Sequence, residues 1–163
     1  MQREYARLPL RIRFPRLSDC LDRIERALDA AADAGIPVVC VQHAGRPGGP
    51  VFDPGGRGFE LCPRIEGRCA PGWKRVVKRH GSIYAGTGLE PWLRERGVDT
   101  VTLVGFMANN CILASAAQGE ALGLTRAVAN YKDPKVLLEA SKDLGEAMVG
   151  INEDEIKVIM SAR

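Results

Sequence analysis

The sequence lacks any long hydrophobic run, and no apolar stretch approaches the roughly 18 residues that a membrane-spanning helix needs. Its first residues also lack the basic, apolar and small-residue succession of a secretory signal peptide. These two absences predict a protein that has no membrane partner, and we expect a cytoplasmic location.

Histidine is scarce, and the cysteines are poorly spaced for metal binding. The chain has two histidines and five cysteines, and no two cysteines show the C-x-x-C spacing of zinc sites. An odd number of cysteines in a chain of this length also argues against a disulfide scaffold. We therefore expect reduced thiols, no metal and no other cofactor.

The net charge gives little support for a nucleic-acid partner, because +3 over 163 residues attracts a phosphate backbone only weakly. The most basic segment, residues 3–16, holds five arginines in fourteen residues. It could contact phosphates, but we favour a solvated loop that leads into the first helix. The content of 45% hydrophobic and 26% charged residues is typical of one folded domain, which we assign to residues 1–163.

Strand-like and helix-like patterns alternate along the chain. Helices are expected from Ser18 to Gly35, from Thr87 to Gly97 and from Cys111 to Gly123, with later ones beginning at Asp133 and Asn152, and strands over 36–41, 74–78, 100–104 and 126–130. Ser18 is the expected cap of the first helix, whose apolar stripe is Leu21, Ile24, Leu28 and Ala32, and Thr87 with Glu90 is expected to form a capping box for the second. This alternation predicts an α/β fold, a three-layer α/β/α domain with a mainly parallel sheet. Residues 43–72 are rich in glycine and proline, and a loop of this length is usually functional.

Cys111 is the residue that best predicts a reactive site. It follows a strand and a loop, and it opens a helix whose free N–H groups and dipole favour a thiolate and can hold an oxyanion. Sites of open α/β sheets gather at this carboxyl end of the strands. A small apolar core residue is the alternative, and position alone does not decide between the two.

Two motifs resemble those of the isochorismatase-like cysteine hydrolases. Lys78 precedes the run SIYAGTGL at residues 82–89, and Cys111 lies in GFMANNCI at residues 105–112. The resemblance covers roughly residues 1–125 and implies that Cys111 is the nucleophile and Lys78 its electrostatic partner. It also implies a cis peptide bond at Phe106–Met107 and an oxyanion hole formed by the N–H groups of Met107 and Cys111.

A third catalytic residue of that family, an aspartate at the end of its first strand, has no counterpart here. In the family Met and Gln commonly follow that aspartate, and this chain starts with Met1-Gln2, so we expect a truncated first strand. Neither Glu4 nor Asp19 matches the motif, and we assign the role to no residue. Some relatives bind zinc through Asp-x-His, whereas His43 stands alone, which argues against a metal.

Residues 126–163 resemble a different protein, the C-terminal tail of the lyase subunit of pyridoxal 5′-phosphate synthase. The likeness rests on VANYKDP at 128–134 and SKDLGEAMVGIN at 141–152. It begins where the basic residues change from sixteen Arg and two Lys over 1–126 to one Arg and four Lys over 127–163. We interpret the chain as a candidate chimera whose tail supplies no catalytic group.

These patterns together favour a cysteine-dependent hydrolase of a small molecule. Its target is either an amide C–N bond or an isochorismate-like vinyl ether, and loss of the aspartate would impair it. The alternative is a truncated or chimeric scaffold without catalysis. We also expect a homo-oligomer, because a sheet that lacks an inner strand leaves an edge unpaired.

Overall fold

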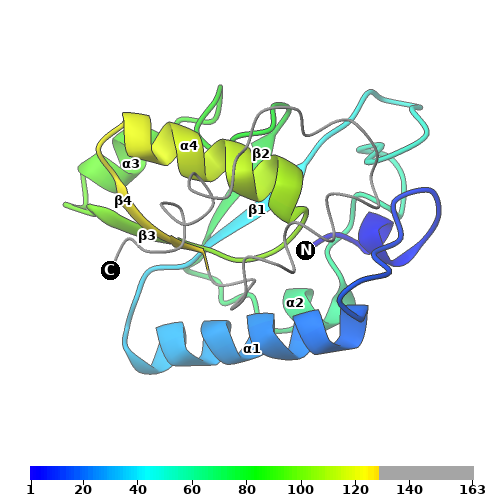
Figure 1. The fold of residues 1–163 in the computed structure, drawn as a ribbon, viewed down its shortest axis with the longest axis horizontal. Helices are drawn as coiled ribbons and strands as arrows, with labels where there is room; N and C mark the ends of the chain where they lie inside the picture. The colour runs from blue at the N-terminus through cyan, green and yellow to red at the C-terminus, as the bar shows by residue number, and fades with distance from the viewer. Residues whose placement is uncertain (129–163) are drawn as a thin grey trace.

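The computed structural model describes residues 1–128, which form three layers. Helix α1 (Leu17–Asp33) and the short helix α2 (Pro63–Glu66) cover one face of the strands, whereas α3 (Leu89–Arg94) and α4 (Leu113–Ala121) cover the other (Figure 1). The predicted α/β class and its three layers are therefore confirmed. No helix in this part of the chain is long and apolar enough to cross a membrane.

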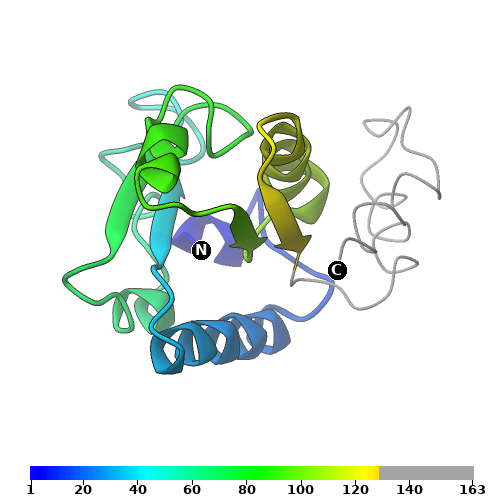
Figure 2. The same cartoon turned by 90° about the vertical axis from the view of Figure 1, so that its left-hand side faces the viewer.

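The strands form two parallel pairs. Strand β1 (Val39–His43) pairs with β2 (Lys74–Lys78), and β3 (Thr100–Leu103) pairs with β4 (Thr125–Val128). Over residues 1–128 no hydrogen bond ladder joins the two pairs, which Figure 2 shows as separate. The parallel pairing agrees with the prediction, but the strands do not form one continuous sheet here.

Strand β1 begins later than the apolar run predicted and keeps one open edge. Ile36 is 58% exposed, and its N–H donates to Ala31 at the end of α1. Along a strand, the backbone N–H and C=O groups of successive residues point to opposite edges. Ala44, the residue that follows β1, donates its N–H to the Lys78 carbonyl of β2. The backbone N–H and C=O groups of Val39, Val41 and His43 therefore point away from β2. Within residues 1–128 no strand pairs with them on that edge.

Helix α1 connects the two strand pairs on its side of the molecule. Its buried stripe of Leu21, Ile24 and Leu28 packs against Val38, which precedes β1, and Val104, which follows β3. Three residues of the predicted stripe are buried, whereas its fourth member, Ala32, is exposed. The predicted end at Gly35, where φ is +64°, is confirmed. The predicted cap is wrong, because Ser18 lies inside the first turn and its hydroxyl donates to Asp19.

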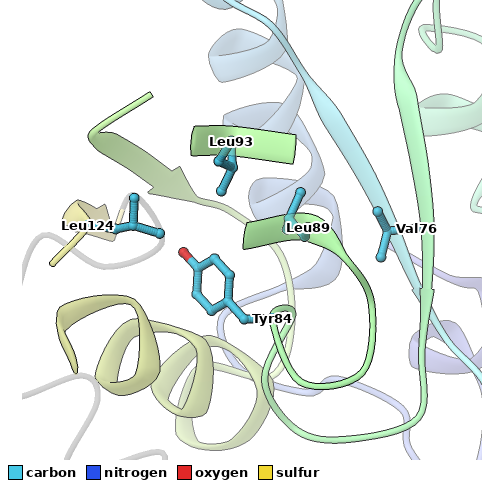
Figure 3. Packing of buried hydrophobic residues seen from close by; sticks show 5 residues of the cluster. All are labelled: Val76, Tyr84, Leu89, Leu93 and Leu124. Carbon is cyan, nitrogen blue, oxygen red and sulfur yellow. The ribbon is translucent and has the colours of Figure 1, made fainter. Parts of the chain in front are cut away.

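A second core lies between the strands and the helices α3 and α4 (Figure 3). It consists of Val76, Tyr84, Leu89, Leu93 and Leu124, and burial of each such side chain contributes about 1.5–3 kcal/mol. Helix α4 comes close to this core because it presents Ser115, Ala116 and Gly119. A Cβ atom at Gly119 would lie 3.0 Å from the Tyr84 hydroxyl oxygen. Small residues on α4 therefore bring its first turns close to the segment after β2.

The N-terminal segment is buried, and the prediction of a solvated loop is wrong for its first residues. Gln2, Glu4 and Tyr5 are 2–4% exposed, and residues Arg3–Ala6 form a 3₁₀ turn, η1. Glu4 accepts a hydrogen bond from the Phe52 N–H at 3.1 Å, and its own N–H donates to the Gly58 carbonyl at 3.1 Å. These bonds fasten part of the long loop to η1.

The remaining predicted elements have mixed outcomes. Gly97, with φ +62°, ends the turn that follows α3, but the predicted capping box is not formed. Gly88 rather than Thr87 is the N-cap of α3, Thr87 accepts from the Leu89 N–H, and Glu90 binds Arg94. The predicted helices that begin at Asp133 and Asn152 lie outside the described residues, as does Asn130 at the end of the predicted last strand.

Candidate active site

Lys78 lies at the carboxyl end of β2 and is 4% exposed. Its Nζ donates to the carbonyl oxygens of His80 at 2.8 Å and Gly81 at 2.9 Å. It also lies 3.1 Å from Cys111 Sγ and 3.3 Å from His43 Nδ1. A buried ammonium needs such partners, because it leaves water on folding. Lys78 is thus a buried lysine with four polar neighbours at its Nζ.

Cys111 lies in a π-helical turn, η2 (Ala108–Ile112), that leads directly into α4. The helical segment therefore begins three residues earlier than the sequence indicated. Ser115, which is 1% exposed, donates to the Cys111 carbonyl at 2.6 Å and accepts from the Ile83 N–H at 3.0 Å. This hydroxyl links the segment of Cys111 to the segment after Lys78.

The turn before Cys111 has the expected backbone. The Phe106–Met107 peptide bond is cis, and the Met107 carbonyl accepts the N–H groups of Asn110 and Ile112. Tyr5 donates from its hydroxyl to the Phe106 carbonyl at 3.3 Å. Burial, and then the charge of Cys111, raise the pKa of Tyr5 well above its ordinary value. The hydroxyl therefore stays protonated and remains a donor.

His43 is a site residue that the sequence analysis considered only as a metal ligand. It is the register partner of Lys78 across the parallel pair, so both side chains project from the same face at the carboxyl ends of β1 and β2. Burial, and then the charge of Lys78, lower the pKa of His43, and its ring packs edge-on against Phe52 at 5.2 Å between centroids. Pairing the two predicted strands at their ends would have brought this residue to notice.

No carboxylate of residues 1–128 forms an ion pair with Lys78. Glu4 is turned towards Phe52 and Arg7, and Asp19 binds Arg16 on α1. Among these residues there is also no group of three or more side chains that could hold a metal ion. The site as described consists of a thiol, an ammonium and an imidazole.

A thiol beside a buried lysine at the carboxyl ends of parallel strands is an arrangement suited to nucleophilic hydrolysis. The family comparison agrees with this class, because the isochorismatase domain matches residues 1–130. The chain belongs to the isochorismatase family, as the two motifs around Lys78 and Cys111 indicated.

Solved structures of the family share this fold. A protein from Burkholderia xenovorans LB400, described as a candidate isochorismatase, is 37% identical with a TM-score of 0.74; the match covers 78% of this chain and 60% of that one. The N-carbamoylsarcosine amidase from Thermoplasma acidophilum is 25% identical with a TM-score of 0.70, over 89% of this chain and 88% of that one. The chain thus spans about three fifths of the first of these relatives.

A second, unrelated similarity is also present. The pyridoxal 5′-phosphate synthase subunit PdxS of Desulfitobacterium hafniense (strain DSM 10664 / DCB-2) is 48% identical over 58 residues, which are 36% of this chain and 20% of that protein. The PdxS of Treponema denticola is 60% identical over the same length. The predicted second likeness is therefore confirmed, and the matched stretch is longer than residues 126–163.

Proposed function

We propose that the chain is a thiol-dependent hydrolase of small amides, with Cys111 as nucleophile and Lys78 as its electrostatic partner. The observation that carries this proposal is the 3.1 Å distance between Lys78 Nζ and Cys111 Sγ. A buried ammonium at that distance favours the thiolate over the thiol and stabilises negative charge as the reaction proceeds. Surface lysines do not have this effect, because water screens them.

In the proposed reaction the Cys111 thiolate attacks the amide carbonyl carbon, and the carbonyl oxygen becomes an oxyanion. The N–H groups of Met107 and Cys111 are the proposed donors to that oxyanion. The C–N bond then breaks, the nitrogen leaves as an amine after taking up the proton that the Cys111 thiol gave up, and a thioester remains on Cys111. Water hydrolyses the thioester to the acid and restores the thiol.

An amide suits this site better than a vinyl ether does. A thiolate next to an ammonium supplies a nucleophile for acyl transfer, whereas a vinyl ether is cleaved after protonation of its carbon and needs no thiol. The name of the Thermoplasma acidophilum relative, an amidase, supports the same bond type. Vinyl ether hydrolysis remains the second candidate, since the Burkholderia xenovorans relative is described as an isochorismatase.

The test is turnover of a panel of small primary amides and ureido acids, followed by ammonia release, with an isochorismate-like vinyl ether as a separate arm. Cys111→Ser should lower amide hydrolysis by at least about 10³-fold. Lys78→Met keeps a long unbranched side chain at this buried position but removes its charge, and it should lower amide hydrolysis by about 10²- to 10³-fold.

Cys20→Ser is the matched control, because this thiol lies on α1, near the Pro15 carbonyl rather than the site. It should leave turnover unchanged. Amide hydrolysis that survives in Cys111→Ser would overturn the proposal, and turnover confined to the vinyl ether would favour the second candidate. A folded protein without turnover on either arm would favour the non-catalytic scaffold.

A further inference from the structure

The contacts of Lys78 and His43 raise the question of where the proton of Cys111 goes when the thiolate forms. Lys78 Nζ has three N–H donors, but four acceptor atoms lie around it: two carbonyl oxygens, Cys111 Sγ and His43 Nδ1. Among residues 1–128, none of the ion pairs brings a carboxylate to Nζ. His43 is therefore the described side chain at Nζ that can accept a proton and become charged.

His43 is also held firmly in position. Its backbone N–H donates to Gln2 Oε1 at 2.7 Å, and its carbonyl accepts from Gln2 Nε2 at 2.9 Å. The His43 ring packs edge-on against the Phe52 ring. Its Nδ1 lies 3.3 Å from Lys78 Nζ. The imidazole is thus fixed with its Nδ1 facing the Lys78 Nζ.

We propose that His43 holds the proton that Cys111 gives up, with Lys78 as the relay between them. The ammonium passes a proton to His43 Nδ1 and becomes an amine, which then takes the proton from the thiol. The net result is a Cys111 thiolate, a Lys78 ammonium and a His43 imidazolium, and no other reactant is needed. The inference rests on the proposed function only in taking Cys111 as the nucleophile.

The surroundings of His43 suit a proton that is held briefly. Burial and the charge of Lys78 lower its pKa, so the ring is neutral at neutral pH and free to accept. A hydrogen bond with the His80 carbonyl acts in the opposite direction and favours the charged ring, while the charge of His80 lowers the pKa slightly further. The N-terminal segment contributes the uncharged Gln2, and Glu4 on that segment is bound to the Phe52 N–H.

The pH dependence of Cys111 alkylation by iodoacetamide tests this inference without a known substrate. From about pH 5 to about pH 10 the wild-type rate should rise in two limbs. The lower limb follows the titration of His43 and the upper limb follows loss of the thiol proton to solvent. His43→Asn keeps a polar atom near Nζ but cannot hold a proton, so its profile should show the upper limb alone.

His80→Asn is the control, because Lys78 contacts only the backbone carbonyl of that residue. Its profile should keep both limbs. A profile of His43→Asn that superimposes on the wild type would overturn the inference. Loss of amide hydrolysis in Cys111→Ser is a separate measurement, so the proposed function can fail while the alkylation profile still reports on His43.

A second measurement avoids substitution of His43. The chain has only two histidines, so the imidazole resonances of His43 and His80 can be followed by NMR over the same pH range. A His43 that shares a proton with Cys111 titrates in two steps in the wild type and in one step in Cys111→Ala. Identical His43 curves in the two proteins would contradict the inference, and His80 should titrate alike in both.

Discussion

At the scale of residues, a buried lysine is the centre of the candidate active site. Lys78 is 4% exposed, and the polar groups around its Nζ are two carbonyl oxygens, a thiol and an imidazole. A cation in such surroundings is stable only while those partners remain, and it favours negative charge next to it. The thiol of Cys111 is the neighbour that can take up that charge.

Cys111 is expected to react before the other four cysteines when an alkylating agent is limiting at neutral pH, because thiolates are the reactive form. Burial, and then the neighbouring Cys69, raise the pKa of Cys40 to about 11, and burial raises that of Cys20. Peptide mapping after brief labelling measures the order. Uniform labelling, or modification of Cys111 last, would contradict this prediction.

At the scale of elements, the site depends on a loop that is anchored by the N-terminal turn. Phe52 donates to the buried Glu4 carboxylate, and its ring contacts Tyr5 and His43. Gly58 allows this arrangement, because a Cβ atom there would overlap the Glu4 carboxylate. The loop therefore has a conformation set by contacts far away in the sequence.

Gly58→Ala should lower the free energy of unfolding by about 1–3 kcal/mol, because Glu4 must move away from the buried Phe52 N–H. Thermal and denaturant unfolding measure this loss. Gly72→Ala is the control, since its added Cβ meets no atom within 4 Å and its φ is not positive. Equal stability of the two variants would show that the contact with Glu4 is not needed for the fold.

At the scale of the whole molecule, two parallel strand pairs are held together by helices packed across both. Helix α1 contacts Val38 and Val104, and the opposite core joins Val76 of β2 to Leu124 before β4. The edge of β1 that carries Val39 and Val41 has no strand partner among the described residues. Open edges of this kind favour association with another strand.

We therefore expect the chain of 163 residues to self-associate or to melt at a lower temperature than a version carrying an added β-strand that ends in Asp before Met1. Such a strand would pair with the open edge of β1. Sedimentation velocity and thermal melts of both proteins test this. A monodisperse monomer with the same Tm as the extended version would contradict it.

Local sequence patterns were sufficient for the elements and for two site residues. Most of the apolar stripe of α1, the bounds of β2 and, to within one residue, those of β3 could be predicted, because periodicity and glycine stops are local properties of the chain. Lys78 and Cys111 could be found because each lies in a motif next to such an element. The start of β1 and the cap of α1 could not be predicted, since the Ile36 N–H bonds the Ala31 carbonyl near the end of α1 and the Ser18 hydroxyl bonds Asp19 inside the first turn.

The tertiary structure alone decided which distant groups meet. Parallel register places His43 beside Lys78, and the small residues of α4 bring Cys111 to the same ammonium. The burial of Glu4 and Tyr5 in a segment rich in arginine likewise depends on partners about 50 and 100 positions away. A linear pattern predicts which residue types are present, but distances between side chains depend on strand register and helix packing, which no local signal encodes.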